Sequence, residues 1–288
     1  NTDSLIRLAE APAALARPCG ADPALLAFLV RFAPPAHSGD RGLFCPASLA
    51  GATLPAAAAA LLAGARDGWV PPCEVSRACV ALTRTAGAFA RRLAERTRRA
   101  CPERAFTLAV LSPLGWLAVA SIDHSVAAEA LHDPDAPPAP PVQADVWGLD
   151  QDSIARRLAN RWRMPAWVAS ALGNFTLPLH LARAVVADAG AFAVAQLALL
   201  EAERRVRSLG LSHGADRVAL LDELEVTDAA VQEAWAAGVD QPEEPRALTV
   251  LDPNPQKVPL LANLLKMAAD SRRRNSASLV ARLEDRLD

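Results

Sequence analysis

The run FTLAVLSPLGWLAVASI at residues 106–122 contains no charged side chain, so most of it has to be shielded from water. A membrane-spanning helix needs about 20 consecutive, strongly apolar residues. This run is shorter, and Ser112, Pro113 and Gly115 interrupt its centre. We therefore expect a buried core helix with an interrupted start and no membrane span.

The composition favours helices around this buried run. Hydrophobic residues make up 52% of the 288-residue chain, yet tyrosine is absent and only 7 residues are phenylalanine. Alanine and leucine form helices most readily, whereas the β-branched and aromatic residues that suit strands are scarce. We expect an all-α fold whose core is packed by leucine, alanine and valine.

Charge and cysteine content narrow the class of protein further. With 30 basic and 32 acidic residues the net charge is −2, so no chain-wide field attracts nucleic acid or an anionic membrane. The 5 cysteines form no C-x-x-C pair, and the N-terminus shows no signal-peptide pattern. These features predict a cytoplasmic protein with reduced thiols that binds neither nucleic acid nor membrane.

The clearest helical pattern precedes the apolar run and ends before Pro102. Its apolar stripe consists of Leu82, Ala86, Phe89 and Leu93. The opposite face carries Arg91, Arg92, Arg96, Arg98 and Arg99. Such a cluster indicates either a solvated helix face or a phosphate site.

A second helical block follows a proline-rich segment, residues 132–143, which we expect to be an extended loop. Either Asp150 or Asp152 is expected to cap a helix, and Pro165 to open the next one. The apolar stripe of the first of these helices is Ile154, Leu158 and Trp162.

A third helical block is predicted over residues 189–210, with Gly210 at its end. Its apolar front half and charged back half indicate a helix that enters the core and leaves it again. Thr227 is expected to cap a further helix. The leucines of residues 260–287 are typical of a linker followed by the start of a coiled coil, through which the chain would form a homodimer.

Common catalytic signatures are absent: the sequence has no phosphate-binding P-loop, no dinucleotide-binding glycine motif, no H-E-x-x-H and no G-x-S-x-G. Two histidine–aspartate neighbours remain as candidate metal ligands, at positions 123–124 and 132–133. The first pair is expected at a helix end or on the surface, and the second lies against the proline-rich segment.

Two motifs together resemble a known family. Residues 111–117 read L-S-P-L-G-W-L, and residues 148–151 read G-L-D-Q, followed by Ala155, Ala159, Trp162 and Met164-Pro165. They are similar to the motifs L-H-D-I-G-K-L and G-x-D-H…A-x-x-L-A-x-x-W-x-L-P. Over residues 54–240 the order of elements resembles the HDOD domain, an all-helical relative of the HD-type metal phosphohydrolases found in bacterial signalling proteins.

The resemblance implies a metal position that has lost its ligands. Ser112 and Pro113 stand where the enzymes have the histidine and aspartate, Gln151 stands where a histidine is usual, and Asn174-Phe175 replace a histidine pair. The late aspartate of the enzymes falls near Leu199. Gly115 would permit close helix approach, and Trp116 would fill the vacated volume. The residues expected around this vestigial cleft or ligand pocket are Ser112, Trp116, Gln151, Arg156 and Asn174.

The resemblance therefore implies a non-catalytic regulatory domain with no metal and no cofactor. Its domains are expected to be a helical or loop extension (residues 1–53), the HDOD-like bundle (54–240) and a linker with the start of a C-terminal helix (241–288). It would pass a signal to a protein partner or to a C-terminal output domain, as in sensor histidine kinases.

Two alternatives remain open. One is a metal-dependent phosphohydrolase or cyclic-dinucleotide phosphodiesterase with shifted ligands, drawn from Asp123, His124, His132 and Asp133. The other is a sensor that binds a nucleotide in the vestigial cleft.

Overall fold

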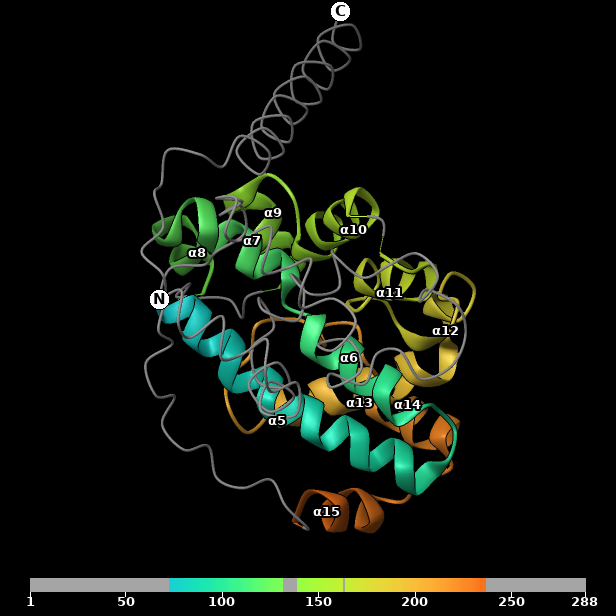
Figure 1. Cartoon of the computed structure of the whole chain (residues 1–288). Coiled ribbons are helices and arrows are strands. Elements are labelled where there is room, and N and C mark those ends of the chain that lie inside the picture. The colour runs from blue at the N-terminus through green and yellow to red at the C-terminus, as the bar shows by residue number, and fades with distance from the viewer. Residues whose placement is uncertain (1–72, 132–138, 163, 237–288) are drawn as a thin grey trace, which may run out of the picture.

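The computed structural model describes residues 73–131, 139–162 and 164–236, and every regular element within these ranges is a helix (Figure 1). The predicted all-α fold is confirmed. In chain order the helices are α5 (Glu74–Thr97), α6 (Pro102–Leu111), α7 (Leu114–Ile122), α8 (His124–Leu131), α9 (Pro140–Trp147), α10 (Gln151–Arg161), α11 (Ala166–Leu172), α12 (Leu179–Ala182), α13 (Ala189–Glu203), α14 (Arg217–Leu224) and α15 (Asp228–Ala236).

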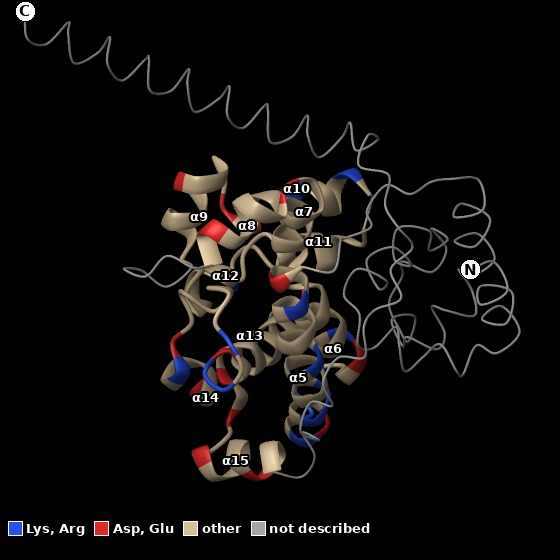
Figure 2. Cartoon of the chain, turned by 90° about the vertical axis from the view of Figure 1, so that its left-hand side faces the viewer, with Lys and Arg blue, Asp and Glu red and all other residues tan. Residues whose placement is uncertain are grey.

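The centre of the bundle is formed by α5, α6 and α13, which pack against one another. Figures 1 and 2 both show α7, α8, α9 and α10 on one side of this centre and α14 and α15 on the other. Further contacts join α7 to α10, α10 to α11, α13 to α14 and α15 to α5. The fold thus places the two predicted motif segments, α7 and α10, directly against each other.

The long helix α5 follows its predicted stripe. Leu82, Ala86, Phe89 and Leu93 are all completely buried. The helix ends at Thr97 because Arg98 adopts a left-handed conformation with φ 54°, and α6 begins at Pro102. The helix thus ends a few residues before the proline.

The apolar run is buried, as expected, but it forms two helices. Residues 105–120 are buried without exception, and α6 and α7 are separated by a turn at Ser112-Pro113. Within the described residues, Pro102–Ile122 alone is long and apolar enough to cross a membrane, with a mean hydropathy of 1.8 over an 18-residue window, and 89% of that window is buried inside the protein.

Most of the predicted helix starts are confirmed. The Asp150 carboxylate accepts a hydrogen bond from the Ser153 backbone N–H at 2.8 Å and so caps α10. Pro165 immediately precedes α11. The Thr227 hydroxyl accepts from the Ala230 N–H at 3.3 Å at the start of α15.

Two predicted boundaries are wrong. The end of the expected proline-rich loop is helical, because α9 begins at Pro140 and proline suits the first turn of a helix. The third helical block ends at Glu203, not near Gly210. Glu203 accepts hydrogen bonds from the backbone N–H groups of Leu209, Leu211 and Ser212, which turns the chain back toward the core.

Other expectations lie outside the described residues. These are the N-terminal extension (1–53), the first part of the HDOD-like region (54–72) and the C-terminal linker with its coiled-coil start (241–288). They stay predictions.

Candidate functional site

The contact between α7 and α10 depends on Gly115. A Cβ atom at this position would lie 2.8 Å from the Cα of Gln151 and closer still to its carbonyl oxygen. Both neighbours are backbone atoms of the first turn of α10, so they cannot move aside as a flexible side chain could. Glycine therefore allows the two helices to touch, as the sequence predicted.

Trp116 occupies the interior beside this contact. Its side chain is completely buried, and its indole N–H donates to the Leu209 carbonyl oxygen at 2.9 Å. Its ring meets that of Trp147 edge to face, with centroids 4.6 Å apart. Trp116 thus ties α7 to α9 and to the segment after α13, and it fills the interior as expected.

Gln143 links the Leu209 carbonyl to α10. Its side-chain N–H donates to the Leu209 carbonyl at 3.3 Å, and its side-chain oxygen accepts from the Gln151 backbone N–H at 2.9 Å. Gln143 and Gln151 are both completely buried. Buried amide groups are stabilising only when they are hydrogen-bonded, so these bonds specify how α9 and α10 pack.

Asp152 extends this series of hydrogen bonds from Gln151 to Thr176. One carboxyl oxygen, Oδ1, contacts the Gln151 side-chain amide, and the other, Oδ2, accepts from the Thr176 N–H and the Thr176 hydroxyl, both at 2.8 Å. Thr176 lies between α11 and α12. We refer to Trp116, Gln143, Gln151, Asp152, Thr176 and the Leu209 carbonyl together as the buried network.

The electrostatic environment of Asp152 is unusual for an acid. Burial raises its pKa from 3.8 to about 7, although the two hydrogen bonds from Thr176 favour the charged form. The Asp150 charge raises the pKa further, and Arg156 lowers it. Next to Asp152, the Gln151 side-chain oxygen has no hydrogen-bond partner.

Two more buried polar residues hold the neighbouring segments in place. Both oxygens of Glu203 serve as acceptors, from the backbone N–H groups of Leu209 (2.7 Å), Leu211 (3.0 Å) and Ser212 (3.0 Å) and from the Ser212 hydroxyl. The Gln196 side-chain N–H group donates to the carbonyls of Phe175 and Leu177 at 2.9 and 2.8 Å. The segments on either side of the buried network are thus fixed by α13.

The structure brings together only some of the residues predicted for the cleft. Trp116 and Gln151 belong to the buried network. The Ser112 hydroxyl donates to the Ala109 carbonyl at 2.8 Å, and the Asn174 side chain donates to the Ser170 carbonyl at 2.5 Å, so both bond locally within their own segments. Arg156 is exposed and packs its aliphatic carbons across Gly173.

Sequence reasoning missed the residues that organise this region. Gln196 had a detectable signal, because it is a lone amide in the apolar run AFAVAQLALL. Asp152 was considered only as an alternative helix cap. Gln143 gave no signal, since its segment resembles a loop. Glu203 was taken as part of the charged end of a longer helix.

The donor chemistry of these positions does not fit a divalent cation. Such an ion needs several oxygen, nitrogen or sulfur donors directed at one point. An indole N–H can only donate a hydrogen bond, and the Ser112 hydroxyl is directed at its own helix. Leu199, near the expected position of the late aspartate, is buried and apolar. We therefore derive no chemistry through a metal here.

The alternative ligand pair, Asp123 and His124, lies on the surface. Oδ1 of Asp123 accepts from the hydroxyl and N–H of Ser125 and from the N–H of Val126, and these bonds lower its pKa. His132 and Asp133 lie outside the described residues. Among the residues that are described, no group of three or more histidine, cysteine, aspartate or glutamate side chains is placed to hold a metal ion.

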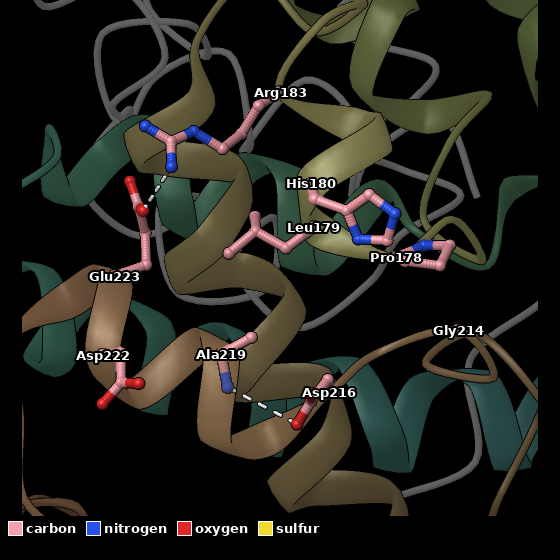
Figure 3. Close-up of a pocket in the computed structure, with 9 residues that line it drawn as sticks. All are labelled: Pro178, Leu179, His180, Arg183, Gly214, Asp216, Ala219, Asp222 and Glu223. Atoms are coloured by element: carbon pink, nitrogen blue, oxygen red, sulfur yellow. Dashed lines mark hydrogen bonds and ion pairs between the residues drawn. The ribbon is translucent and has the colours of Figure 1, made fainter.

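A pocket of about 600 Å³ lies between α12 and α14, and none of the predicted cleft residues lines it (Figure 3). Its apolar floor includes Leu179 and Ala219, and an ion pair of 2.8 Å between Arg183 and Glu223 closes one side. The remaining lining consists of Pro178, His180, Gly214, Asp216 and Asp222. With three acidic side chains against one arginine, this pocket would repel phosphate groups.

Comparisons with known proteins agree with the helical architecture. Residues 77–175 match the family model of the HDOD domain. The MmoQ response regulator of Methylococcus capsulatus str. Bath has the same fold, with a TM-score of 0.58 and 21% sequence identity over 82% of this chain and 95% of that chain.

A second solved structure, from Shewanella amazonensis SB2B and described only provisionally as a phosphohydrolase, matches 81% of this chain and 92% of its own at 19% identity, with a TM-score of 0.37. No curated protein matches the sequence.

Proposed function

Because this chain contains an HDOD domain, at residues 77–175, we propose that it is a non-catalytic regulatory module of bacterial signal transduction. One observation carries the proposal. At the α7–α10 junction, where the resemblance places the metal of the HD enzymes, Trp116 and Gln143 both bond to the Leu209 carbonyl and Gln143 bonds to Gln151. Side-chain packing and hydrogen bonds thus cross-link the helices.

A signalling role is in keeping with the shared fold of the MmoQ chain, which is described as a response regulator. On this proposal the module works in the cytoplasm as the input region of a larger protein, such as a sensor histidine kinase, or acts on a separate protein partner. A homodimer through the C-terminal helix would bring two modules together.

The last described helix, α15, is the natural connection to such an output. The ring of Trp235 in α15 contacts the Phe89 ring, with centroids 5.0 Å apart and planes tilted by 57°, and the Arg205 guanidinium lies 4.1 Å from the Trp235 centroid. Phe89 belongs to the central helix α5. A change in the bundle would therefore reach the chain beyond α15 through this aromatic contact.

The nucleotide-sensor alternative gains no support from the pocket between α12 and α14. Its lining carries Asp216, Asp222 and Glu223, which oppose an anionic ligand. This pocket is therefore not proposed as a nucleotide site.

Metal analysis combined with activity assays tests the proposal. The full chain, purified without chelators, is analysed for transition metals and assayed with nucleotides and cyclic dinucleotides, alongside an active HD phosphohydrolase as positive control. We expect less than stoichiometric metal and no turnover. A stoichiometric metal together with turnover would overturn the proposal.

A further inference from the structure

Asp152 is a buried acid with no ion-pair partner among the residues that the structure describes. Only 4% of the residue is exposed, and within the described part of the chain its side chain makes no ion pair. The charged groups that act on it, Asp150 and Arg156, both belong to its own region of α10. The segments packed around it, α7, α11 and residues 173–178, contain no charged side chain.

The neighbours of Asp152 suit both of its protonation states. As a carboxylate it accepts from the Gln151 amide and from the N–H and hydroxyl of Thr176. As a neutral acid it would have a proton to donate, and the Gln151 side-chain oxygen is a buried acceptor without a partner. Rotating the Gln151 amide end for end would turn that oxygen toward the acid.

The bond to Thr176 connects this acid to the pocket between α12 and α14. A Cβ atom on Gly214 would lie 2.9 Å from the Thr176 carbonyl carbon and closer still to its oxygen, so Gly214 packs directly against Thr176. Gly214 and Pro178, two residues after Thr176, both line the pocket. A movement of Thr176 would therefore displace the pocket wall shown in Figure 3.

We propose that Asp152 is a proton-operated switch: loss of its proton tightens its hold on Thr176, and uptake of a proton, with rotation of the Gln151 amide, releases the segment that supports the pocket. The proposal depends on the connection of Asp152 to Thr176 and Gly214, and it holds whether or not the domain is catalytic. Burial places the pKa of Asp152 at about 7, so both states are populated near neutral pH.

The backbone amide of Thr176 reports the switch directly. The full chain is labelled with 15N-threonine, and the Thr176 resonance is identified by its loss in Thr176→Ser. We expect its chemical shift to titrate between pH 5 and 9 with a midpoint of about 7. Asp152→Asn should abolish this titration, whereas Asp150→Asn, which changes the neighbouring helix cap, should retain it.

A Thr176 resonance that does not titrate over this range in the wild-type chain would overturn the proposal, as would a titration that persists in Asp152→Asn. If Asp152→Asn does not fold, Thr176→Val, labelled with 15N-valine so that the amide of residue 176 is again observed, provides a second test. Loss of the hydroxyl donor removes a bond that favours the carboxylate, so the midpoint at position 176 should move to higher pH. An unchanged midpoint would contradict the role of Thr176.

Discussion

The buried network and the attachment of α15 both join helices through polar side chains, yet in opposite surroundings. Trp116, Gln143 and Gln151 are completely buried. In contrast, the Arg96–Glu233 pair that joins α5 to α15 spans 2.6 Å between side chains that are 45% and 65% exposed. Figure 2 shows basic residues along α5 and around α14, on the side of the bundle where α15 lies.

This difference in burial determines how much each contact stabilises the fold. Removing one partner of a buried hydrogen bond leaves the other polar group with neither a protein partner nor water, which costs about 1–3 kcal/mol. An exposed ion pair contributes only about 0–1 kcal/mol, because water and salt screen it. The polar bonds of the α7–α10 junction should therefore stabilise the fold more than the Arg96–Glu233 ion pair does, and α15 should be held to α5 chiefly by the contact between Trp235 and Phe89.

Trp116→Ala should have the largest effect on stability. It removes a completely buried ring and its bond to the Leu209 carbonyl, which by analogy with other large-to-small core substitutions costs about 3–5 kcal/mol. Chemical denaturation of the full chain measures the loss. Trp116→Phe, which retains most of the apolar volume, should lose clearly less. Equal losses would show that the ring itself contributes little.

Gly115→Ala should rank second. The added methyl group would collide with the Gln151 backbone, and overpacking of this kind costs about 1–3 kcal/mol. Denaturation again measures the effect. Ser121→Ala lies in the same helix, and its hydroxyl bonds only within that helix, so it should be nearly neutral. A Gly115→Ala variant as stable as wild type would mean that α7 and α10 can separate without cost.

Glu203→Gln should cost about 1–3 kcal/mol, because the amide nitrogen of glutamine cannot accept the backbone N–H bonds that a carboxylate oxygen accepts. The amides of Leu209, Leu211 and Ser212 should also exchange with solvent faster, which hydrogen exchange measures. Unchanged exchange rates would show that Glu203 does not hold this segment.

Arg96→Ala should have the smallest effect. Its ion pair with Glu233 is exposed, so we expect a loss of about 0–1 kcal/mol that disappears at high salt. Denaturation at low and high ionic strength separates this contribution from packing. A loss as large as that of Trp116→Ala would erase the contrast between the two regions.

The raised pKa of Asp152 predicts that the stability of the folded chain changes with pH. Its pKa is raised from 3.8 to about 7 in the folded chain, so its contribution favours the fold at low pH and is lost as the pH rises through 7. Melting temperatures measured between pH 5 and 8 should therefore fall less steeply in Asp152→Asn than in the wild-type chain. Parallel curves would show that Asp152 stays ionised throughout.

Much of the helical framework could be predicted because its signals are local. The stripe on α5, the cap at Asp150 and the start of α11 after Pro165 each depend on residues within a turn or two of one another. The start of α9 and the end of α13 were mispredicted. The end of α13 depends on Glu203 bonding to residues up to 9 positions later, which helical periodicity does not reveal.

The candidate site was predictable only in part. Gly115 and Trp116 could be identified from their place in a motif, and the structure confirms that they allow close packing and fill the interior. The role of Gln143 could not be identified, because its partner Leu209 is 66 residues away.

The amino-acid sequence alone determined a helical chain with a buried, uncharged segment at its centre, since periodicity and composition act over a few residues. The tertiary structure decided which polar side chains share the interior. Gln143, Gln151 and Asp152 acquire their roles only when packing excludes water from around them. Each side chain then bonds to another member of the group or to a distant backbone group.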